Sequence, residues 1–534
     1  MHVTRPVTMG REVMVATPHY LASMAAARIL IEGGNAFDAA IAANAVLTVV
    51  YPHNCSLGGD AFWLIYHSST GKLMGLNGSG RSPYSATREF FKDEGMSQIP
   101  LRGILPVTVP GVVDSWCTML KEYGSRELQE VFRPAIYYAR EGFPVSEKLS
   151  RWIKHAAPVV STYPTSKKIF LRGGRAPEPG EILVQRDLSR TLEKLAKGGR
   201  EVFYEGDIAE SIVKFCRQND GLLSEQDLTE HKSDWVKPIA TSYRGYGVYE
   251  FPPNSQGVAA LLELNILEGF DLRSLGRLSA QSIHLMVEAK KLAFADRDRY
   301  VSDPERADIP VEELISKSYG RKRRGKIDPC KAMERASAGN PVGGDTVYLA
   351  TLDKDGNAVS LIQSIYFDFG SGMVAGDTGI LLQNRGAYFS LSDDHVNRLE
   401  PHKRTLHTLA PGMMFENDEL RMVFGTMGGD GQPQTHLQLV TNTVDFGMNV
   451  QEAIEAPRWL HGRVEIGELE QVLNLEEGIR PAVVRTLRKK GHRVRVLERW
   501  NEKFGHAQAI FIHPSGKVLM GGADPRGDGV AVGW

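Results

Sequence analysis

Residues 343–357 read Gly-Gly-Asp-Thr-Val-Tyr-Leu-Ala-Thr-Leu-Asp-Lys-Asp-Gly-Asn: two glycines and an Asp-Thr pair, then a strand-like run and a cluster of turn residues. Strand character resumes in residues 358–366, so the pattern predicts a β-hairpin with a short loop. If the turn centres on Asp355, Thr346 lies opposite Ser364, with Cβ atoms about 5 Å apart. A hydroxyl residue that begins a strand therefore faces a second hydroxyl residue across the hairpin.

This arrangement suits a nucleophile that creates its own N-terminus. Attack of the Thr346 hydroxyl on the carbonyl of Asp345 gives an ester, whose hydrolysis frees Thr346 as a new N-terminus. The released α-amine, with a pKa of about 7.7–8.0 in model peptides, is a general base near neutral pH. Ser364 is expected to hold the hydroxyl or the amine in place. Taken alone, Gly-Gly-Asp-Thr before a strand is more often an ordinary loop, so the interpretation needs a second feature.

The second feature is a glycine pair between a strand and a helix. Residues 422–426 have strand character, Gly428 and Gly429 follow, and residues 434–444 have helical character. Consecutive glycines let the backbone approach a ligand, and N–H groups at the start of a helix attract an oxyanion. The alternative is an ordinary strand-to-helix turn. A phosphate-binding loop fits less well, because the Lys-Ser/Thr pair of that motif is absent.

The composition is that of a large globular chain. Its 534 residues are 42% hydrophobic and 24% charged, which excludes a disordered or fibrous protein and predicts either several domains or one large α/β body. The 63 basic and 64 acidic residues give a net charge of -1, so no nucleic-acid or anionic-membrane partner is expected. Four widely separated cysteines exclude a disulfide scaffold and a clustered-thiolate zinc site.

Two segments of the chain bear on targeting, the N-terminus and the most apolar stretch. Residues 1–14 lack the continuous apolar segment of a signal peptide, and residues 39–51, the best membrane candidate, are too short to span a bilayer. We therefore expect a soluble, cytoplasmic protein.

Residues 319–344, basic and then small and polar, are interpreted as a solvated surface linker, with a nucleic-acid patch as the weaker alternative. Apolar spacing predicts further helices at 21–31, 35–48, 256–268 and 280–297, and a strand at 61–66.

With these features placed, the sequence resembles the γ-glutamyltranspeptidase (glutathione hydrolase) family over nearly its whole length. The resemblance implies an N-terminal-nucleophile (Ntn) hydrolase of the α/β (α+β) class, a four-layer αββα sandwich made as one precursor. The precursor is cut between Asp345 and Thr346 into a large subunit, 1–345, and a small subunit, 346–534, which form one body. The motifs that carry the resemblance are Glu32 to Ala40, Leu57-Gly58-Gly59, Gly111, Pro252 to Gly257, Ala295-Asp296-Arg297, Asp353 to Val359, Gly428-Gly429 and Ala523 to Arg526.

The resemblance also implies roles for the residues around the cut. Thr346 takes the position of the nucleophile, and Ser364 that of a threonine whose hydroxyl supports it. Gly428 and Gly429 match the glycine pair of the oxyanion hole. Neither a metal nor an organic cofactor is implied. The implied partners are a small-molecule γ-glutamyl or glutaryl amide and the two subunits of one precursor, with a dimer of such heterodimers left open.

Substrate recognition departs from the family pattern. The aspartate that binds the α-amino group of the γ-glutamyl moiety is Tyr388 here, the neighbouring glutamine is Arg385, and the asparagine after the supporting hydroxyl is Tyr366. The serine pair that holds the α-carboxylate aligns with His407 and Thr408. Loss of the carboxylate removes the direct counter-charge for an ammonium group.

Recognition of a substrate carboxylate is expected to survive through arginines. Arg81 stands two residues before Pro83, where the family has an arginine four residues before the proline, and positions two apart on an extended strand share a face. Arg385 would be a second cation near the pocket; for Arg81, a plain surface position is the alternative. The segment 388–408 is short where other members carry a lid, and an open site favours hydrolysis over transfer to an acceptor.

The sequence therefore predicts a self-processing amidohydrolase that cleaves γ-glutamyl amides such as glutathione, with hydrolysis favoured over transpeptidation. Two alternatives stay open. One is a glutaryl or cephalosporin-type acylase, because a glutaryl group keeps the carboxylate and lacks the amine. The other is an unprocessed, catalytically silent binding protein, against which the intact set of Thr346, Ser364, Gly428 and Gly429 argues.

Overall fold

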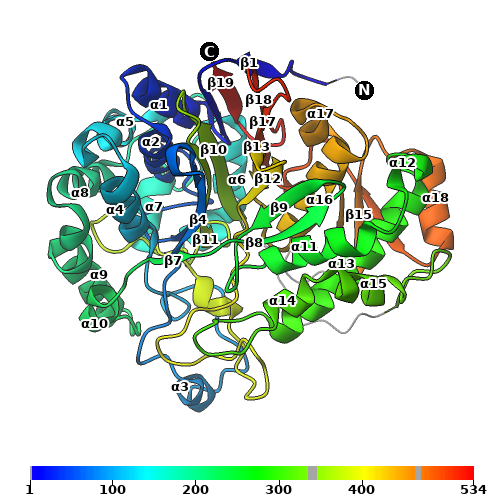
Figure 1. The fold of residues 1–534 in the computed structure, drawn as a ribbon. Coiled ribbons are helices and arrows are strands. Elements are labelled where there is room, and N and C mark those ends of the chain that lie inside the picture. The colour runs from blue at the N-terminus through cyan, green and yellow to red at the C-terminus, as the bar shows by residue number, and fades with distance from the viewer. Residues whose placement is uncertain (1–2, 335–344, 463–470) are drawn as a thin grey trace.

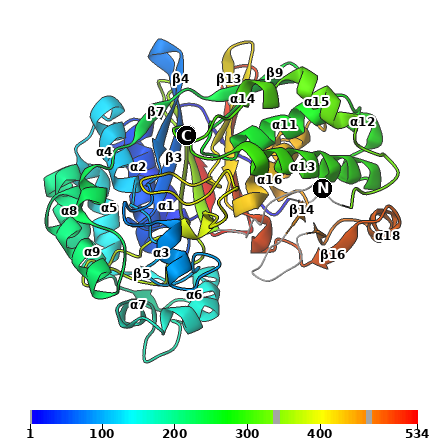
Figure 2. The same ribbon diagram turned by 90° about the horizontal axis from the view of Figure 1, so that it is seen from below.

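The computed structural model describes residues 3–334, 345–462 and 471–534, and its centre is a pair of stacked β-sheets. Each sheet has seven strands, and all neighbouring strands in both are antiparallel. Helices cover the outer face of each sheet (Figures 1 and 2). The predicted four-layer αββα sandwich is thereby confirmed.

The first sheet holds the predicted hairpin at its centre. Its strands, in spatial order, are β19 (Val530–Gly533), β2 (Met14–Thr17), β10 (Asp345–Leu352), β11 (Ala358–Tyr366), β3 (Asp60–His67), β4 (Lys72–Gly78) and β7 (Asp234–Val236). The second sheet is ordered β1 (Thr8–Gly10), β18 (Leu519–Ala523), β17 (Ala507–Ile512), β13 (Glu419–Thr426), β12 (Gly412–Glu416), β9 (Tyr246–Glu250) and β8 (Ile239–Tyr243). Both sheets combine strands from before and after Thr346.

Two groups of helices form the outer layers. Over the first sheet lie α1 (Tyr20–Ile31), α2 (Ala36–Val50), α4 (Val112–Tyr123), α5 (Leu128–Glu141), α8 (Arg186–Tyr204) and α9 (Asp207–Gln218). Over the second lie α11 (Gly257–Leu267), α13 (Ala280–Tyr300), α15 (Lys317–Arg324), α16 (Gln432–Val444) and α17 (Val450–Glu455). The peripheral helices are α3 (Arg88–Asp93), α6 (Glu147–Val160), α7 (Pro164–Phe170), α10 (Glu225–Thr229), α12 (Leu272–Leu275), α14 (Val311–Leu314) and α18 (Pro481–Lys489).

Small sheets and single turns complete the described chain. A three-stranded sheet is made of β14 (Trp459–His461), β15 (Val472–Glu476) and β16 (Arg493–Leu497), and β5 (Phe143–Pro144) pairs with β6 (Ile182–Leu183). Short 3₁₀ turns are η1 (Ser68–Thr70), η2 (Arg385–Tyr388), η3 (Gly429–Gly431) and η4 (Glu502–Phe504). Of these, η2 and η3 carry residues predicted to form the site.

The alternation of side chains along β10 explains why the strand is buried on both faces. Tyr348, Ala350 and Leu352 enter the apolar layer between the two sheets, whereas Val347 and Leu349 pack under the helices. Successive residues of a strand point to opposite faces, so a strand between two apolar layers must be apolar throughout. The run of β-forming residues after Thr346 has this composition.

Local signals in the sequence fix most of the predicted elements. Residues 21–31 and 35–48 become α1 and α2, and α2 starts with a capping box in which Asn35 and Asp38 exchange side-chain and backbone hydrogen bonds. The predicted helices at 256–268 and 280–297 correspond to α11 and α13, and the strand at 61–66 lies within β3. These predictions are confirmed with shifts of a few residues at the ends.

The interpretation of residues 319–344 as a solvated linker is wrong for its first part. Residues 319–324 belong to α15, which is capped by Ser316. Gly320 packs closely against Asn265, and the Arg323 Nε lies 2.9 Å from an Asp296 carboxylate oxygen. The basic run is thus one helix held against its neighbours, and residues 335–344 lie outside the described residues.

The hairpin register is as predicted over six pairs, from Val347 opposite Gln363 to Leu352 opposite Ala358. In the turn, the Asp353 carboxylate accepts hydrogen bonds from the backbone N–H groups of Asp355 and Asn357, at 3.0 and 2.9 Å. Such local bonds pre-form the turn that sets the register.

None of the helices described by the structure is both long and apolar enough to cross a bilayer.

Candidate active site

The predicted pairing breaks at the residue that matters most. Asp345 pairs with Tyr366 and Val347 with Gln363, so Ser364 and its neighbour Ile365 both lie opposite the single residue Thr346. The prediction of a simple Thr346–Ser364 pair is therefore corrected to a β-bulge. A bulge bends the strand and re-aims side chains, and bulges are common beside active sites. Thr346 is 1% exposed, and its Oγ1 has no hydrogen-bond partner.

Asn54, in the loop before β3, holds the backbone on both sides of the bulge. Its Nδ2 donates to the Thr346 carbonyl oxygen at 3.1 Å, and its own carbonyl oxygen accepts from the N–H of Ile365 at 3.3 Å. Thr346 is thus fixed by its carbonyl while its hydroxyl is left without a partner.

Ser364 connects the hairpin to the recognition end of the site. Its Oγ accepts a hydrogen bond from the Tyr366 N–H at 2.8 Å and one from an Arg385 Nη2 at 3.2 Å. Tyr366 has a φ of 80°, in the left-handed region that bulky residues rarely adopt. Strain of this kind persists where the surrounding contacts enforce it, and it clusters at functional sites.

Arg385 is a buried cation without a carboxylate partner among the described residues. Its side chain is fully buried, Nη1 donates to the Thr408 Oγ1 at 3.2 Å, and the guanidinium lies 4.4 Å from the centre of the Tyr366 ring. Its Nε has no hydrogen-bond partner. Burial lowers the pKa of Arg385 to about 10, which still leaves it protonated at neutral pH. An unpaired buried charge is costly unless an anionic ligand completes it.

The glycine pair adopts conformations that few other residues tolerate. Gly428 has a φ of 125° and Gly429 one of 52°, and the chain then turns through η3 into α16. The Gln256 Nε2 donates to the carbonyl oxygens of Gly429 and Thr408, at 2.8 and 2.7 Å. Within the described residues, the N–H groups of Gly428 and Gly429 have no protein acceptor. Donors of this kind are what an oxyanion requires.

The tyrosine at the family's aspartate position is bonded to a carboxylate from elsewhere. The Tyr388 hydroxyl donates to the Asp430 Oδ1 at 3.2 Å, and the same oxygen accepts from an Arg297 Nη1 at 2.5 Å. The rings of Tyr388 and Tyr366 meet edge to face, with centroids 5.4 Å apart. Burial raises the pKa of both phenols, so each remains a neutral donor at neutral pH.

His407 belongs to a buried hydrogen-bond network and carries no charge at neutral pH. Its Nε2 lies 3.1 Å from an Asp60 carboxylate oxygen, and the other Asp60 oxygen accepts from the Gly80 N–H and the Gln383 Nε2, both at 2.9 Å. Burial, reinforced by the positive charge of Arg385, lowers the pKa of His407 to about 4. His407 therefore supports the loop that carries Thr408 rather than adding a second cation.

Arg81 is engaged elsewhere. Its Nη2 donates to both Glu305 carboxylate oxygens, at 3.0 and 3.1 Å, and lies 3.6 Å from an Asp234 carboxylate oxygen. The guanidinium charge is thereby balanced by two acidic side chains. Binding of a substrate carboxylate by Arg81 stays a prediction, and the uncompensated cation in the described site is Arg385.

Comparison with known proteins identifies the family. The γ-glutamyltranspeptidase family model matches residues 22–534. The chain belongs to the γ-glutamyltranspeptidase family. It is 48% identical over 526 residues to the glutathione hydrolase-like YwrD proenzyme of Bacillus subtilis, covering 98% of this chain and 99% of that relative. It is 38% identical over 542 residues to the oxamate amidohydrolase proenzyme of Klebsiella pneumoniae, with complete coverage of both chains.

A solved structure has nearly the same fold as this chain. The crystal structure of the cephalosporin acylase from Bacillus halodurans superposes with a TM-score of 0.93 at 41% identity, covering 100% of this chain and 98% of that chain. The names of the relatives describe enzymes, several of them proenzymes, and they act on different amides by name. Membership thus makes this chain an enzyme of that family and leaves its substrate open.

The contacts bring most of the predicted residues of this γ-glutamyltranspeptidase site together. A continuous chain of contacts joins Thr346, Ser364, Tyr366, Arg385, Tyr388, Thr408 and the Gly428-Gly429 pair, and His407 supports it from behind. Sequence reasoning missed Asn54, Gln256, Arg297 and Asp430 as site residues. Gln256 and Arg297 stand inside quoted motifs and Asp430 follows the glycine pair, so position relative to these motifs was the available signal.

A second polar cluster lies away from this site. Among the described residues, His284, Glu288 and His492 offer ligand atoms within 4.8 Å of one another, which is metal-like spacing. The His284 Nδ1 and the His492 Nε2 already share a hydrogen bond of 2.8 Å. Glu288 accepts from the Lys291 ammonium at 2.8 Å and from the Met333 N–H at 2.9 Å. The polar atoms of this cluster thus have protein partners, and the positive charge beside the Glu288 carboxylate is the Lys291 ammonium rather than a metal ion.

Proposed function

We propose that the chain is a self-processing amidohydrolase that cleaves γ-glutamyl amides such as glutathione, with water as the favoured acceptor. The observation that carries the proposal is the fully buried, unpaired guanidinium of Arg385, which bonds the hydroxyls of Ser364 and Thr408 next to the bulge at Thr346. A buried cation beside a nucleophile selects acyl groups that end in a carboxylate.

Maturation would begin with Thr346. Its Oγ attacks the carbonyl carbon of Asp345, the peptide C–N bond breaks, and the nitrogen takes up the hydroxyl proton, which leaves an ester and a free α-amine. Water then hydrolyses the ester, giving a carboxylate on Asp345 and restoring the hydroxyl. The products are a large subunit, 1–345, and a small subunit, 346–534. The buried Oγ1, free of any competing hydrogen bond, suits this attack.

Turnover would repeat the same chemistry on a substrate. The Thr346 α-amine takes the proton of its own hydroxyl as Oγ attacks the amide carbonyl, and then delivers that proton to the leaving amine. The N–H groups of Gly428 and Gly429 stabilise the oxyanion of the tetrahedral intermediate. Water, activated by the same α-amine, hydrolyses the acyl-enzyme. The chemistry uses only side chains and backbone groups of this protein.

The recognition of the acyl group would come from loop residues around Arg385. The substrate carboxylate is taken by the guanidinium and the Thr408 hydroxyl, and the methylene chain lies against Tyr366. For the α-ammonium of a γ-glutamyl group, the Oδ2 of Asp430 is a buried acceptor without a partner, beside the Tyr388 hydroxyl. A carboxylate thus stands next to the position where other family members have theirs.

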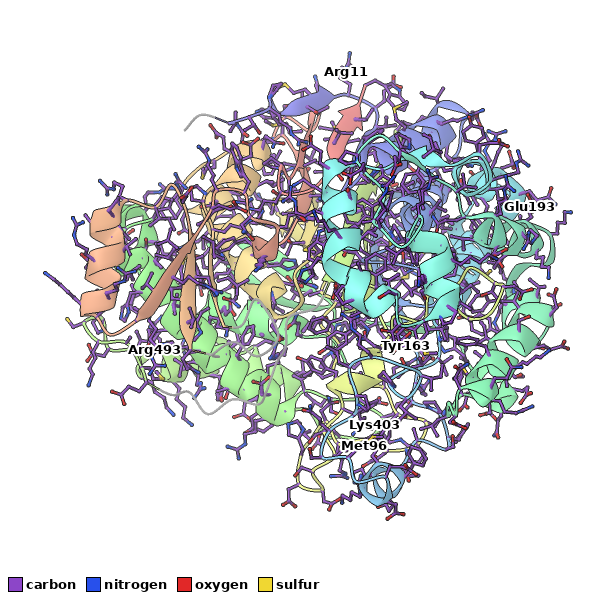
Figure 3. All side chains as sticks on the ribbon, turned by 180° about the vertical axis from the view of Figure 1, so that it is seen from behind. Arg11, Met96, Tyr163, Glu193, Lys403 and Arg493 are labelled. Carbon is purple, nitrogen blue, oxygen red and sulfur yellow. The ribbon has the colours of Figure 1, made fainter. Side chains whose placement is uncertain are left out.

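The loop that follows Tyr388 bears on the choice of water as acceptor. Phe389, Leu391 and Leu399 pack against Phe91 and the other apolar residues around α3. Figure 3 labels Lys403 of this loop and Met96 in the lower part of the molecule. The shortness of this loop is the reason to propose that water competes well for the acyl-enzyme.

A glutaryl or cephalosporin-type acylase is the second candidate. Tyr388 favours it, because a phenol gives no counter-charge to an ammonium, and Arg297 at 2.5 Å already draws on the charge of Asp430. A glutaryl group needs only the carboxylate contacts of Arg385 and Thr408. This reading predicts equal or better turnover of a glutaryl amide than of the matching γ-glutamyl amide.

Two measurements test the proposal. On a denaturing gel, purified protein should resolve into two bands, and the uncut chain should convert to them on incubation without added protease. Parallel assays with γ-glutamyl and glutaryl chromogenic amides then decide the substrate. An active protein that stays as one band would refute the mechanism, and failure to mature on prolonged incubation would favour the silent binding protein.

A further inference from the structure

The side-chain amide of Asn54, which binds the Thr346 carbonyl oxygen, has a carbonyl oxygen that accepts no hydrogen bond. The Asn54 side chain is fully buried, and its Nδ2 donates to the Thr346 carbonyl oxygen at 3.1 Å, but its Oδ1 has no hydrogen-bond partner. Because the bonded atom of Thr346 is a carbonyl oxygen, the amide must present its NH₂ group there and its oxygen on the other side. The unpartnered Oδ1 therefore belongs to the same amide group whose Nδ2 binds Thr346.

Another buried asparagine shows what a structural amide looks like in this fold. The Asn44 Nδ2 donates to the Gln363 Oε1 at 2.7 Å, and the Asn44 Oδ1 accepts from the Trp116 Nε1 at 2.8 Å. Both halves of that amide are satisfied, as is usual for buried polar groups. Asn54 lacks the second hydrogen bond that Asn44 makes, and it lies beside the peptide bond that is expected to be cut, so its unmet acceptor calls for an explanation.

Cleavage supplies the missing donor. In the precursor, the nitrogen of Thr346 is a peptide nitrogen with a single hydrogen, whereas after the cut it is a primary amine with two, or an ammonium with three. We propose that Asn54 is a positioning residue that holds Thr346 by its carbonyl oxygen in the precursor and accepts a hydrogen bond from the new α-amine on Oδ1 after the cut. This inference rests on the self-processing mechanism proposed above.

The placement of Asn54 suits both tasks. Its N–H donates to the Tyr51 carbonyl at 3.1 Å, and its carbonyl accepts from Ile365, one of the two residues of the bulge. The amide is thereby tied to the strand that faces Thr346 and moves with it. With the amine held on one side, its lone pair is left to face Oγ1, which is the geometry that a general base requires.

The elements that form the site also carry charged and titratable groups. They are Arg385 from η2, Asp60 from β3 with His407, Asp430 after the glycine pair, Tyr366 at the end of β11 and His53 next to Asn54. Substitution of Asn54 leaves all of these in place. A change in the titration of the amine between Asn54 variants therefore reports the loss or gain of one acceptor.

The test measures the pKa of the Thr346 α-amine in the mature, two-chain protein. The mature protein is treated with acetic anhydride over a range of pH, and mass spectrometry of the N-terminal peptide of the small subunit gives the labelled fraction of the α-amine. An acceptor stabilises the protonated form, so Asn54→Ala should lower this pKa by roughly half to one pH unit, and Asn54→Asp, with an anionic acceptor, should raise it. Asn44→Ala, the matched control, should leave it unchanged.

Maturation gives a second readout. Asn54→Ala should lengthen the half-life of the uncut chain by about tenfold or more, because the Thr346 carbonyl loses its anchor. If Asn54→Ala folds as wild type but never matures, the holding role stands; Asn54→Asp, which also lacks the Nδ2 donor, should then fail to mature as well, and its maturation would overturn that role. Wild-type maturation together with an unshifted pKa in both Asn54 variants would overturn the inference, as would an equal shift in Asn44→Ala.

The labelling needs no substrate, so it separates this inference from the proposed function. Wild-type protein that matures but hydrolyses neither γ-glutamyl nor glutaryl amides would contradict the proposed activity, while the opposite shifts of the two Asn54 variants would still uphold the role of Asn54. Wild-type protein that never yields a free Thr346 N-terminus would overturn both.

Discussion

The two ends of the proposed active site are built in different ways. The nucleophile end consists of neighbouring strands and a glycine turn, where Thr346 and the N–H groups of Gly428 and Gly429 are placed mainly by backbone geometry. The recognition end consists of loop side chains, in which Arg385 is held between hydroxyl groups and a tyrosine ring. The first arrangement depends on strand register, and the second depends on which side chains the loops present.

This difference explains how one family serves several amide substrates. A change in a loop side chain alters the acyl group that is accepted, and it leaves the strands that hold the nucleophile as they are. The relatives named for glutathione, oxamate and cephalosporin chemistry are consistent with such a division. The substitutions below act on one end at a time, in order of expected effect.

Removal of the nucleophile should abolish both maturation and turnover. Thr346→Ala is expected to run as a single band and to lose about 10⁶-fold in kcat, the scale seen when a hydrolase loses its nucleophile. Thr346→Ser keeps a hydroxyl at the bulge and should still mature, more slowly. Two bands from Thr346→Ala on a denaturing gel would show that another group makes the cut.

Disturbance of the oxyanion turn should lower kcat on every amide alike. Gly428→Ala forces an L-residue to adopt a φ of 125°, although the built Cβ would have room, with its nearest neighbour at 3.5 Å. The turn should re-aim its N–H groups, with a loss of about 10²–10³-fold in kcat and little change in KM. Gly516→Ala, at a positive φ in open space, is the control and should lose stability without losing kcat. A loss confined to carboxylate substrates would contradict the division.

Substitution of the buried cation should affect only substrates that carry a carboxylate. Arg385→Met is expected to lower kcat/KM for γ-glutamyl and glutaryl amides by about 100-fold, roughly 3 kcal/mol, and to spare an otherwise similar amide with a neutral acyl group. Arg81→Met tests the rival cation in the same assay. An equal loss in Arg81→Met would restore Arg81 to the binding site despite its pairing with Glu305.

Acid should act on the recognition end through His407. Its folded pKa of about 4 lies below the usual value of 6.5, so between these values the unfolded chain binds a proton that the folded chain refuses. Stability therefore falls as the pH drops through this window, by at most about 1.4 kcal/mol per pH unit for each such histidine. Urea midpoints at pH 7.5, 6.0 and 5.0 measure the slope. His407→Gln should make it shallower, and an unchanged slope would mean that other groups dominate.

The nucleophile end was largely predictable from sequence because strands obey simple rules. Alternation and turn chemistry fixed the β10–β11 pairing for six residue pairs, and the two positive-φ glycines were marked by residue type. The bulge at Thr346 was missed, since one extra residue in a strand leaves no mark in a hydrophobic pattern. It depends instead on tertiary contacts such as that of Asn54 with Ile365.

For the recognition end, the residues that take part could be predicted, but the interactions that each of them makes could not. The family resemblance implied that Arg385, Tyr388, His407 and Thr408 would gather, but not that His407 would be neutral and bonded to Asp60. The expectation for Arg81 relied on two positions of one strand sharing a face. That rule says nothing of acidic residues distant in sequence, and two of these, Glu305 and Asp234, bind its guanidinium.

The strand order of the two sheets has a consequence for how the mature enzyme can be assembled. In the first sheet β10 and β11 lie between β2 and β3. In the second sheet β18, β17, β13 and β12 lie between β1 and β9. Strands from before and after position 346 are therefore interleaved in both sheets. Two chains made separately would have to interleave in both sheets at once. If the chain is cut at position 346 after folding, as proposed, the uncut polypeptide serves as its own template for this assembly. The two chains that result would stay interleaved until they unfold.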